Sequence, residues 1–128
     1  MKTLEVVCGI IKEENGYLIA KRKSNVHNAI WEFPGGKVEA GESREDAIVR
    51  ELKEELNYTC RVVRYLMSVV DERADVCIHV HAYLCEKISG ELEKRAHSEV
   101  QWVAASQLAS YTFEPSDYAI IDALMKVE

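Results

Sequence analysis

Residues 36–58 read GKVEAGESREDAIVRELKEELNY, a glycine-rich segment followed by the pattern of an amphipathic helix. Ser43 is a favoured N-cap residue, and acidic residues fill the next turn, where the helix dipole favours negative charge. Apolar residues at positions 48, 49, 52 and 56 form one stripe, and Asn57 tolerates the left-handed conformation that ends many helices. The pattern predicts a loop over residues 36–43 and a helix over Arg44–Leu56.

Three carboxylates share one face of this expected helix. Glu51, Glu54 and Glu55 are spaced at i, i+3 and i+4, so their like charges repel and destabilise an isolated helix. A hard divalent cation would relieve this repulsion, and the glycines before the helix let the backbone approach a metal or ligand closely. Taken alone, however, the spacing favours an ordinary solvated acidic face.

The whole stretch resembles the Nudix box, G-x5-E-x7-R-E-U-x-E-E-x-G-U, in which U is an aliphatic residue. The matching positions, at the same spacing, are Gly36, Glu42, Arg50, Glu51, Leu52, Glu54 and Glu55. Asn57 replaces the last glycine and Tyr58 replaces the final aliphatic residue, so neither departure touches a carboxylate. A pattern of this length is far more specific than a short glycine motif.

Segments outside the box extend the likeness. The sequence WEFPGGK at residues 31–37 and the Pro115-Ser116-Asp117 turn before a final helix resemble the MutT-like branch, including its CTP pyrophosphohydrolase and 8-oxo-dGTP diphosphatase members. This resemblance implies the hydrolysis of a nucleoside diphosphate linked to another group, with Mg²⁺ or Mn²⁺. For a nucleoside triphosphate, normal or oxidised, the expected products are a nucleoside monophosphate and pyrophosphate.

The resemblance also implies roles for individual residues. Glu51, Glu54, Glu55 and the Gly36 carbonyl hold the metal, which neutralises phosphate charge and lowers the pKa of water. Arg50 orients a helix carboxylate, and one of the helix carboxylates or a loop glutamate takes the proton from the attacking water. Glu42 either fixes the loop or contacts the metal's outer water, unless it serves only as a charge near the helix N-terminus.

Four further residues are expected at the substrate: Arg22, Phe33, Lys37 and Asp117. Arg22 would contact phosphate, although Lys21 or Lys23 could serve instead, and an exposed basic strand end is the simpler explanation. Asp117 either contacts the base or merely caps the final helix. An ionised Asp117 only accepts hydrogen bonds, so it would suit the amino or N–H edges of cytosine or guanine.

Two histidines and one loop position could have further roles at a metal or at the substrate. His79 and His81 share a strand face and could bind a transition metal, but we expect them to line the substrate cleft or to be buried as satisfied polar residues. Some family members carry an extra acidic residue in the loop before the Val100–Val103 segment. The corresponding position here is Ala96, so Glu99 is the expected substitute metal ligand.

The other segments have mostly strand-like patterns. We expect strands over residues 4–12, 17–21, 31–33, 60–70, 75–87 and 100–103, with Asn15-Gly16 as a hairpin turn. Residues 24–30 are expected to form a loop, Ser106 to cap a brief helix, and Ser116 or Asp117 to cap a final helix. The predicted inner face of that helix consists of Tyr118, Ile121, Leu124 and Met125. This order favours an α/β fold with a mixed β-sheet sandwiched between α-helices.

Composition narrows the class of protein. A chain of 128 residues, 48% hydrophobic and 30% charged, is expected to form one domain over residues 1–128. The net charge of −6, without a basic stripe, argues against duplex nucleic acid, and no apolar run approaches a membrane span. The four cysteines form no C-x-x-C pair, which together with the absence of a signal-like N-terminus indicates a cytoplasmic protein. We expect a monomer or homodimer that acts on a small nucleotide.

Three alternatives follow from the same residues. The box does not choose the substrate, so ADP-ribose or a dinucleoside polyphosphate could replace the nucleoside triphosphate. A Nudix-fold module could also bind a nucleotide without turnover, although the intact carboxylates argue against this. A purely structural acidic domain would show no effect of metal or nucleotide on its melting temperature.

Overall fold

The structure is a computed structural model that describes residues 2–22 and 30–127. Its strands are β1 (Lys2–Glu13), β2 (Gly16–Arg22), β3 (Trp31–Glu32), β4 (Gly35–Lys37), β5 (Thr59–Glu72), β6 (Val76–Ser89) and β7 (His97–Val103). Its helices are α1 (Arg44–Leu56), a 3-10 helix η1 (Ala105–Ser110) and α2 (Asp117–Val127). The predicted loop over residues 24–30 lies almost wholly outside the described residues.

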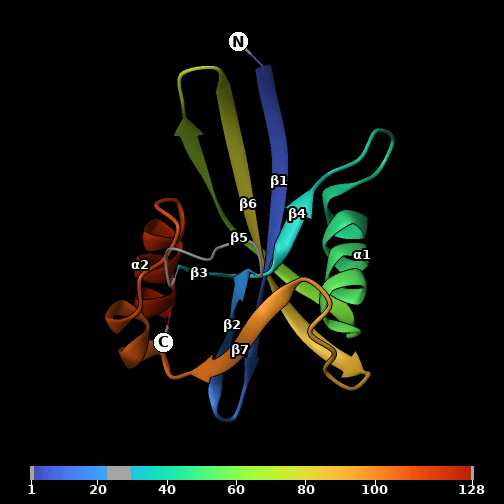
Figure 1. The fold of residues 1–128 in the computed structure, drawn as a ribbon, viewed down its shortest axis with the longest axis vertical. Coiled ribbons are helices and arrows are strands. Elements are labelled where there is room, and N and C mark those ends of the chain that lie inside the picture. Colours follow the sequence, from blue (N-terminus) through green and yellow to red (C-terminus); the bar gives the residue numbers. More distant parts are fainter. Residues whose placement is uncertain (1, 23–29, 128) are drawn as a thin grey trace.

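The seven strands form one mixed sheet with the order β3-β2-β1-β6-β5, in which β4 pairs with β1 and β7 pairs with β2. Strand β1 is parallel to β6 and antiparallel to β2 and β4. Figure 1 shows the strands in the middle of the molecule, with α1 on one side and α2 on the other. The predicted mixed sheet between helices is therefore confirmed.

Helix α1 has the predicted bounds and caps. The Ser43 hydroxyl accepts a hydrogen bond from the backbone N–H of Asp46 at 3.0 Å. Asn57 has a φ of 63°, and its backbone N–H donates to the Lys53 carbonyl at 3.0 Å. The stripe is buried against β1, β2, β5 and β6 in a cluster that includes Val7, Ile11, Leu18, Ala47, Ile48, Leu52, Leu56 and Tyr58. Val49, which was expected in the stripe, is only partly buried and lies outside this cluster, where Ala47 takes part instead. Tyr58 thus fills the apolar position at which it replaces an aliphatic residue.

The predicted inner face of α2 was partly wrong. Ile120, Ile121 and Leu124 are buried on the second face of the sheet, whereas Tyr118 and Met125 are 42% and 51% exposed. Asp117, the first residue of the helix, is buried as well. The buried positions 117, 120, 121 and 124 follow a regular helical spacing, which turns positions 118 and 125 towards solvent.

Several element boundaries also differ from the predictions. Residues 36 and 37 belong to β4 rather than to a loop, because they pair with Val7 and Val6 of β1. Strand β7 begins at His97, since its pairing with β2 extends to Arg22. The short helix begins at Ala105 without a side-chain cap, so Ser106 lies inside it and is not its N-cap.

None of the helices in the described residues is both long and apolar enough to cross a membrane. All four cysteines are free, and Cys8, Cys60 and Cys85 are buried.

Candidate active site

Arg50 organises the carboxylates of α1 and the segment before it. Its Nε and Nη2 atoms donate to the two oxygens of Glu42 at 2.7 and 3.0 Å. Its Nη1 atom donates to Glu51 at 2.9 Å and to Glu54 at 3.1 Å, while Nη2 also donates to the Lys37 carbonyl at 3.1 Å. One guanidinium therefore joins β4, the following segment and two helix carboxylates.

Glu42 closes the segment between β4 and α1. Its carboxylate accepts the backbone N–H of Glu39 at 3.0 Å, in addition to the bidentate pair with Arg50. The Arg50 guanidinium, helped by this N–H, lowers the pKa of Glu42 to about 2. Of the roles considered from the sequence, these contacts match the one in which Glu42 fixes the loop.

Gly36 and Glu51 lie directly against each other. A Cβ built on Gly36 would overlap with the Glu51 carboxylate, so only glycine leaves room for this side chain. The Glu51 side chain is 15% exposed, whereas that of Glu54 is 59% exposed. The close packing places the backbone of β4 directly against one carboxylate of α1.

Glu55 is buried and faces a different neighbour. Its Oε1 atom lies 3.6 Å from Nε2 of His97, which donates a hydrogen bond to Glu32 at 2.9 Å. Oxygens from Glu32 and Glu55 and a ring nitrogen of His97 all lie within 4.8 Å of one another. This group was not predicted from the sequence, because Glu32 and His97 are 65 residues apart in the chain. They come together only because β3 and β7 both pair with β2.

A pocket of about 140 Å³ adjoins Gly36 on the α2 side of the sheet. Its lining includes Gly36, Glu32, Phe33 and Asp117, together with Val80 of β6. Phe33 is buried and stacks on Phe113 with ring centroids 5.5 Å apart. The pocket therefore brings together three residues that the sequence placed at a metal or substrate: Gly36, Phe33 and Asp117.

Asp117 is 5% exposed, and its carboxyl accepts a hydrogen bond from the backbone N–H of Phe33. Burial, reinforced by the nearby carboxylates of Glu32 and Glu114, raises its pKa to about 8. The carboxyl is therefore mostly neutral at pH 7 and can donate as well as accept a hydrogen bond. This corrects our premise that Asp117 is ionised and only accepts.

Three further residues were expected at the site: Lys37, Glu99 and Arg22. The Lys37 side chain is exposed, and only its backbone carbonyl joins the Arg50 network. Glu99 is ion-paired with Lys21 at 3.2 Å and accepts a hydrogen bond from Gln101. Arg22 pairs with His97 through the strand backbone, but its side chain lies outside the described part of the chain, as does all of Lys23.

His79 and His81 do not line the pocket. Val80, between them on β6, faces it, so the two histidines point to the opposite side of the sheet. There Glu5 binds both, at 2.9 Å from Nδ1 of His79 and 2.7 Å from Nε2 of His81. The hydrogen bond from His81, aided by the charge of His79, lowers the pKa of Glu5. The expectation that these histidines line the substrate cleft is therefore not met at this pocket, and Glu5 lies beside them because the parallel register of β1 and β6 places it opposite His79.

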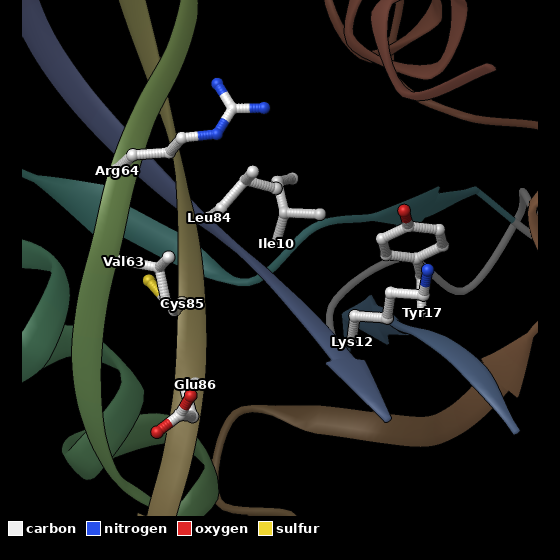
Figure 2. Close-up of a pocket in the computed structure, with 8 residues that line it drawn as sticks. All are labelled: Ile10, Lys12, Tyr17, Val63, Arg64, Leu84, Cys85 and Glu86. Atoms are coloured by element: carbon white, nitrogen blue, oxygen red, sulfur yellow. The ribbon is translucent and has the colours of Figure 1, made fainter. Parts of the chain in front are cut away.

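A second pocket, of about 350 Å³, lies where the β1–β2 and β5–β6 hairpins diverge (Figure 2). Lys12, Tyr17, Arg64 and Glu86 contribute its polar groups. None of the α1 carboxylates lines it, so it is separate from the pocket that contains Asp117.

Two proteins of known name are similar to this chain over almost its whole length. The chain is 36% identical over 126 residues to the CTP pyrophosphohydrolase of Escherichia coli (strain K12), covering 98% of this chain and 93% of that protein. It is 33% identical over 129 residues to the 8-oxo-dGTP diphosphatase of the same organism, covering 99% of this chain and all of that protein (100%).

Solved structures and a model of one protein family also match this chain. The solution structure of the E. coli ORF135 protein has a TM-score of 0.91 at 36% identity and covers 99% of this chain and 91% of that one. The crystal structure of a MutT NUDIX hydrolase from Burkholderia pseudomallei has a TM-score of 0.80 at 26% identity, with 100% of both chains covered. The model of the NUDIX domain matches residues 1–124, and the chain belongs to the NUDIX domain family.

Proposed function

We propose that this protein hydrolyses nucleoside triphosphates to a nucleoside monophosphate and pyrophosphate with the help of a divalent cation. One observation carries the proposal: Gly36 lines the pocket that contains Asp117 and also lies against the Glu51 carboxylate of α1. A nucleoside held in the pocket would therefore direct its phosphates over Gly36 towards the helix carboxylates.

The residues present fit a hard divalent cation. Glu51, Glu54 and Glu55 offer carboxylate oxygens on one helix, and the backbone of Gly36 lies directly against the Glu51 carboxylate. We infer that these four residues hold Mg²⁺ or Mn²⁺. The cation supplies charge neutralisation for the polyphosphate and makes water more acidic.

The chain's own groups then have separate tasks. Arg50 holds Glu51 and Glu54 in place through its Nη1 atom, and Glu42 holds Arg50. One of the α1 carboxylates takes a proton from the attacking water. The water oxygen forms a bond to the α- or the β-phosphorus and the anhydride bond between these two phosphates breaks. Pyrophosphate leaves with the electron pair of that bond if the α-phosphorus is attacked, and the nucleoside monophosphate leaves with it if the β-phosphorus is attacked.

The pocket supplies the contacts to the nucleoside. Phe33 offers an aromatic wall, and Asp117 offers a buried carboxyl that both donates and accepts while it is neutral. We assign phosphate contacts to Arg22 and to the exposed Lys37. Glu99, which pairs with Lys21, is the more distant candidate for a further metal contact.

The relatives that match almost the whole chain support this substrate class, since their names specify CTP and 8-oxo-dGTP. An ADP-ribose pyrophosphatase of Methanocaldococcus jannaschii matches 68% of this chain at 38% identity, and the chain covers 53% of that protein. Nucleoside triphosphates are therefore the preferred assignment, with ADP-ribose as the competitor to test. The four free cysteines fit a reducing compartment, and we place the protein in the cytoplasm.

A product assay tests the proposal. The protein is incubated with Mg²⁺ and, separately, with normal and 8-oxo (d)NTPs, ADP-ribose and a dinucleoside polyphosphate, and products are separated by ion exchange. We expect equal amounts of nucleoside monophosphate and pyrophosphate from at least one triphosphate, and none after chelation. Release of orthophosphate from the γ position, or turnover of ADP-ribose alone, would contradict the proposal.

A further inference from the structure

His97 is the first residue of β7, and its side chain is completely buried between two acidic groups. Nε2 donates a hydrogen bond to Oε2 of Glu32 at 2.9 Å and lies 3.6 Å from Oε1 of Glu55. Glu32 comes from β3 and Glu55 from α1, so one ring nitrogen joins three elements of the fold. Their ligand atoms lie within 4.8 Å of one another.

Two carboxylates this close repel each other strongly in a poorly solvated site. The tautomer with its proton on Nε2 places a donor between them and offsets the repulsion. Within the described part of the chain, Nδ1 of the same ring is buried and has no hydrogen-bond partner. An unsatisfied ring nitrogen costs stability that an apolar side chain would not, so packing alone does not explain a histidine here.

In this structure Nε2, the ring nitrogen of His97 that faces both carboxylates, donates to Glu32 at 2.9 Å and so has no lone pair to offer a metal. These contacts fit a residue that acts on the metal site indirectly, through Glu32 and Glu55.

We propose that His97 is a positioning residue: its ring donates to Glu32 and lies 3.6 Å from the buried Glu55 carboxylate, and this close approach holds Glu55 in place for the metal. Glu32 lines the Asp117 pocket, so His97 connects the metal-binding helix with the nucleoside pocket. The inference rests on the proposed function for its role in turnover, but its effect on metal affinity can be measured without a nucleotide.

The test uses the full chain and Mn²⁺, with binding followed by electron paramagnetic resonance well below each variant's melting temperature. In His97→Asn the amide lies too close to the backbone to replace Nε2, and we expect the Kd for Mn²⁺ to rise about 10- to 100-fold. His97→Gln places an amide N–H near the position of Nε2, and we expect most of the affinity to return. At saturating Mn²⁺, kcat should fall in His97→Asn while KM for the triphosphate changes little.

His81→Asn is the matched control. His81 is also buried and hydrogen-bonded to a glutamate, Glu5, but its other ring nitrogen bonds to Ser68, so its hydrogen bonds go to β1 and β5 rather than to a carboxylate of α1. We expect this variant to lose thermal stability and to keep the wild-type Kd for Mn²⁺. A purely structural role for His97 would make the two asparagine variants behave alike.

Two results would overturn the inference: wild-type Mn²⁺ affinity in His97→Asn, or equal losses in His97→Asn and His97→Gln. Failure of the proposed function looks different. In that case wild type would bind Mn²⁺ in a His97-dependent manner and yet release no pyrophosphate from any triphosphate, which leaves the positioning role intact.

Discussion

Gly36 of β4 packs so closely against the Glu51 carboxylate of α1 that any side chain at position 36 would overlap with it. The contact joins the sheet to the helix at the edge of the pocket that contains Asp117. It shows why a small residue is required at this point: the carboxylate needs the space that a Cβ would occupy.

Gly36→Ala should displace Glu51 and disturb the metal site. We expect the Kd for Mn²⁺ to rise about 10- to 100-fold, with a parallel loss of kcat. Gly9→Ala is the control, because the atoms nearest to its new Cβ belong to the apolar side chains of Leu52 and Ile48 of α1 and not to a carboxylate. That variant should lose stability without losing metal affinity, and equal metal affinities in both variants would contradict the role of Gly36.

Glu54→Gln and Glu55→Gln should each lower kcat by about 10²–10⁴-fold, the usual scale for a proton-accepting group. Glu54 is 59% exposed, so its substitution should leave the melting temperature almost unchanged. Glu45→Gln, in the first turn of the same helix, is the matched control and should remain active. Near-normal kcat in both test variants would move the chemistry to other residues.

Arg50→Lys should weaken the site even though the charge is kept. A lysine ammonium cannot contact both oxygens of Glu42 and also reach Glu51 and Glu54, as the planar guanidinium does. We expect a loss of kcat/KM of about 10- to 100-fold, the scale of other residues that orient metal ligands. Arg44→Lys, at the start of α1, should have no comparable effect in the same assay.

Asp117→Asn should make the protein more stable at high pH. The folded-state pKa of about 8 lies above the ordinary value of 3.8, so the folded state binds the proton more tightly than the unfolded state. Stability from this group is complete below pH 3.8, falls as the pH rises, and is lost above about pH 8. In denaturant unfolding, the advantage of the variant over wild type should therefore grow from pH 5 to pH 9, by more than about 1 kcal/mol. The exposed Asp122→Asn is the control, and an equal gain there would point to net charge instead.

Base preference offers a separate test of Asp117. At pH 7 asparagine supplies a donor and an acceptor, as the neutral carboxyl does, so Asp117→Asn should keep the ranking of kcat/KM among triphosphates. Asp117→Ala should reduce discrimination by about tenfold to a hundredfold, because a buried polar contact is lost. If the alanine variant only lowers the melting temperature, Asp117 serves the helix and not the base.

Local features of the chain were predictable because their causes lie within a few residues. The cap at Ser43, the apolar stripe and the left-handed Asn57 depend on neighbours along the same helix, and α1 has the predicted bounds. The single-face spacing of Glu51, Glu54 and Glu55 follows from helix geometry in the same way. The predictions were wrong where the burial of a side chain depends on segments that are distant in the sequence. Tyr118 and Met125 of α2, for example, were predicted to be buried but are exposed.

Contacts between segments that are far apart in the sequence could be identified only from the three-dimensional structure. Glu5 meets His81, 76 residues away, because β1 and β6 pair in one parallel register. Glu32 meets His97 because β3 and β7 both pair with β2, and α1 then brings Glu55 to the same ring. The raised pKa of Asp117 likewise requires a buried pocket with other carboxylates nearby. Periodicity specifies which face a residue occupies, but strand register and helix packing specify what lies opposite it, and these depend on interactions across the whole sheet.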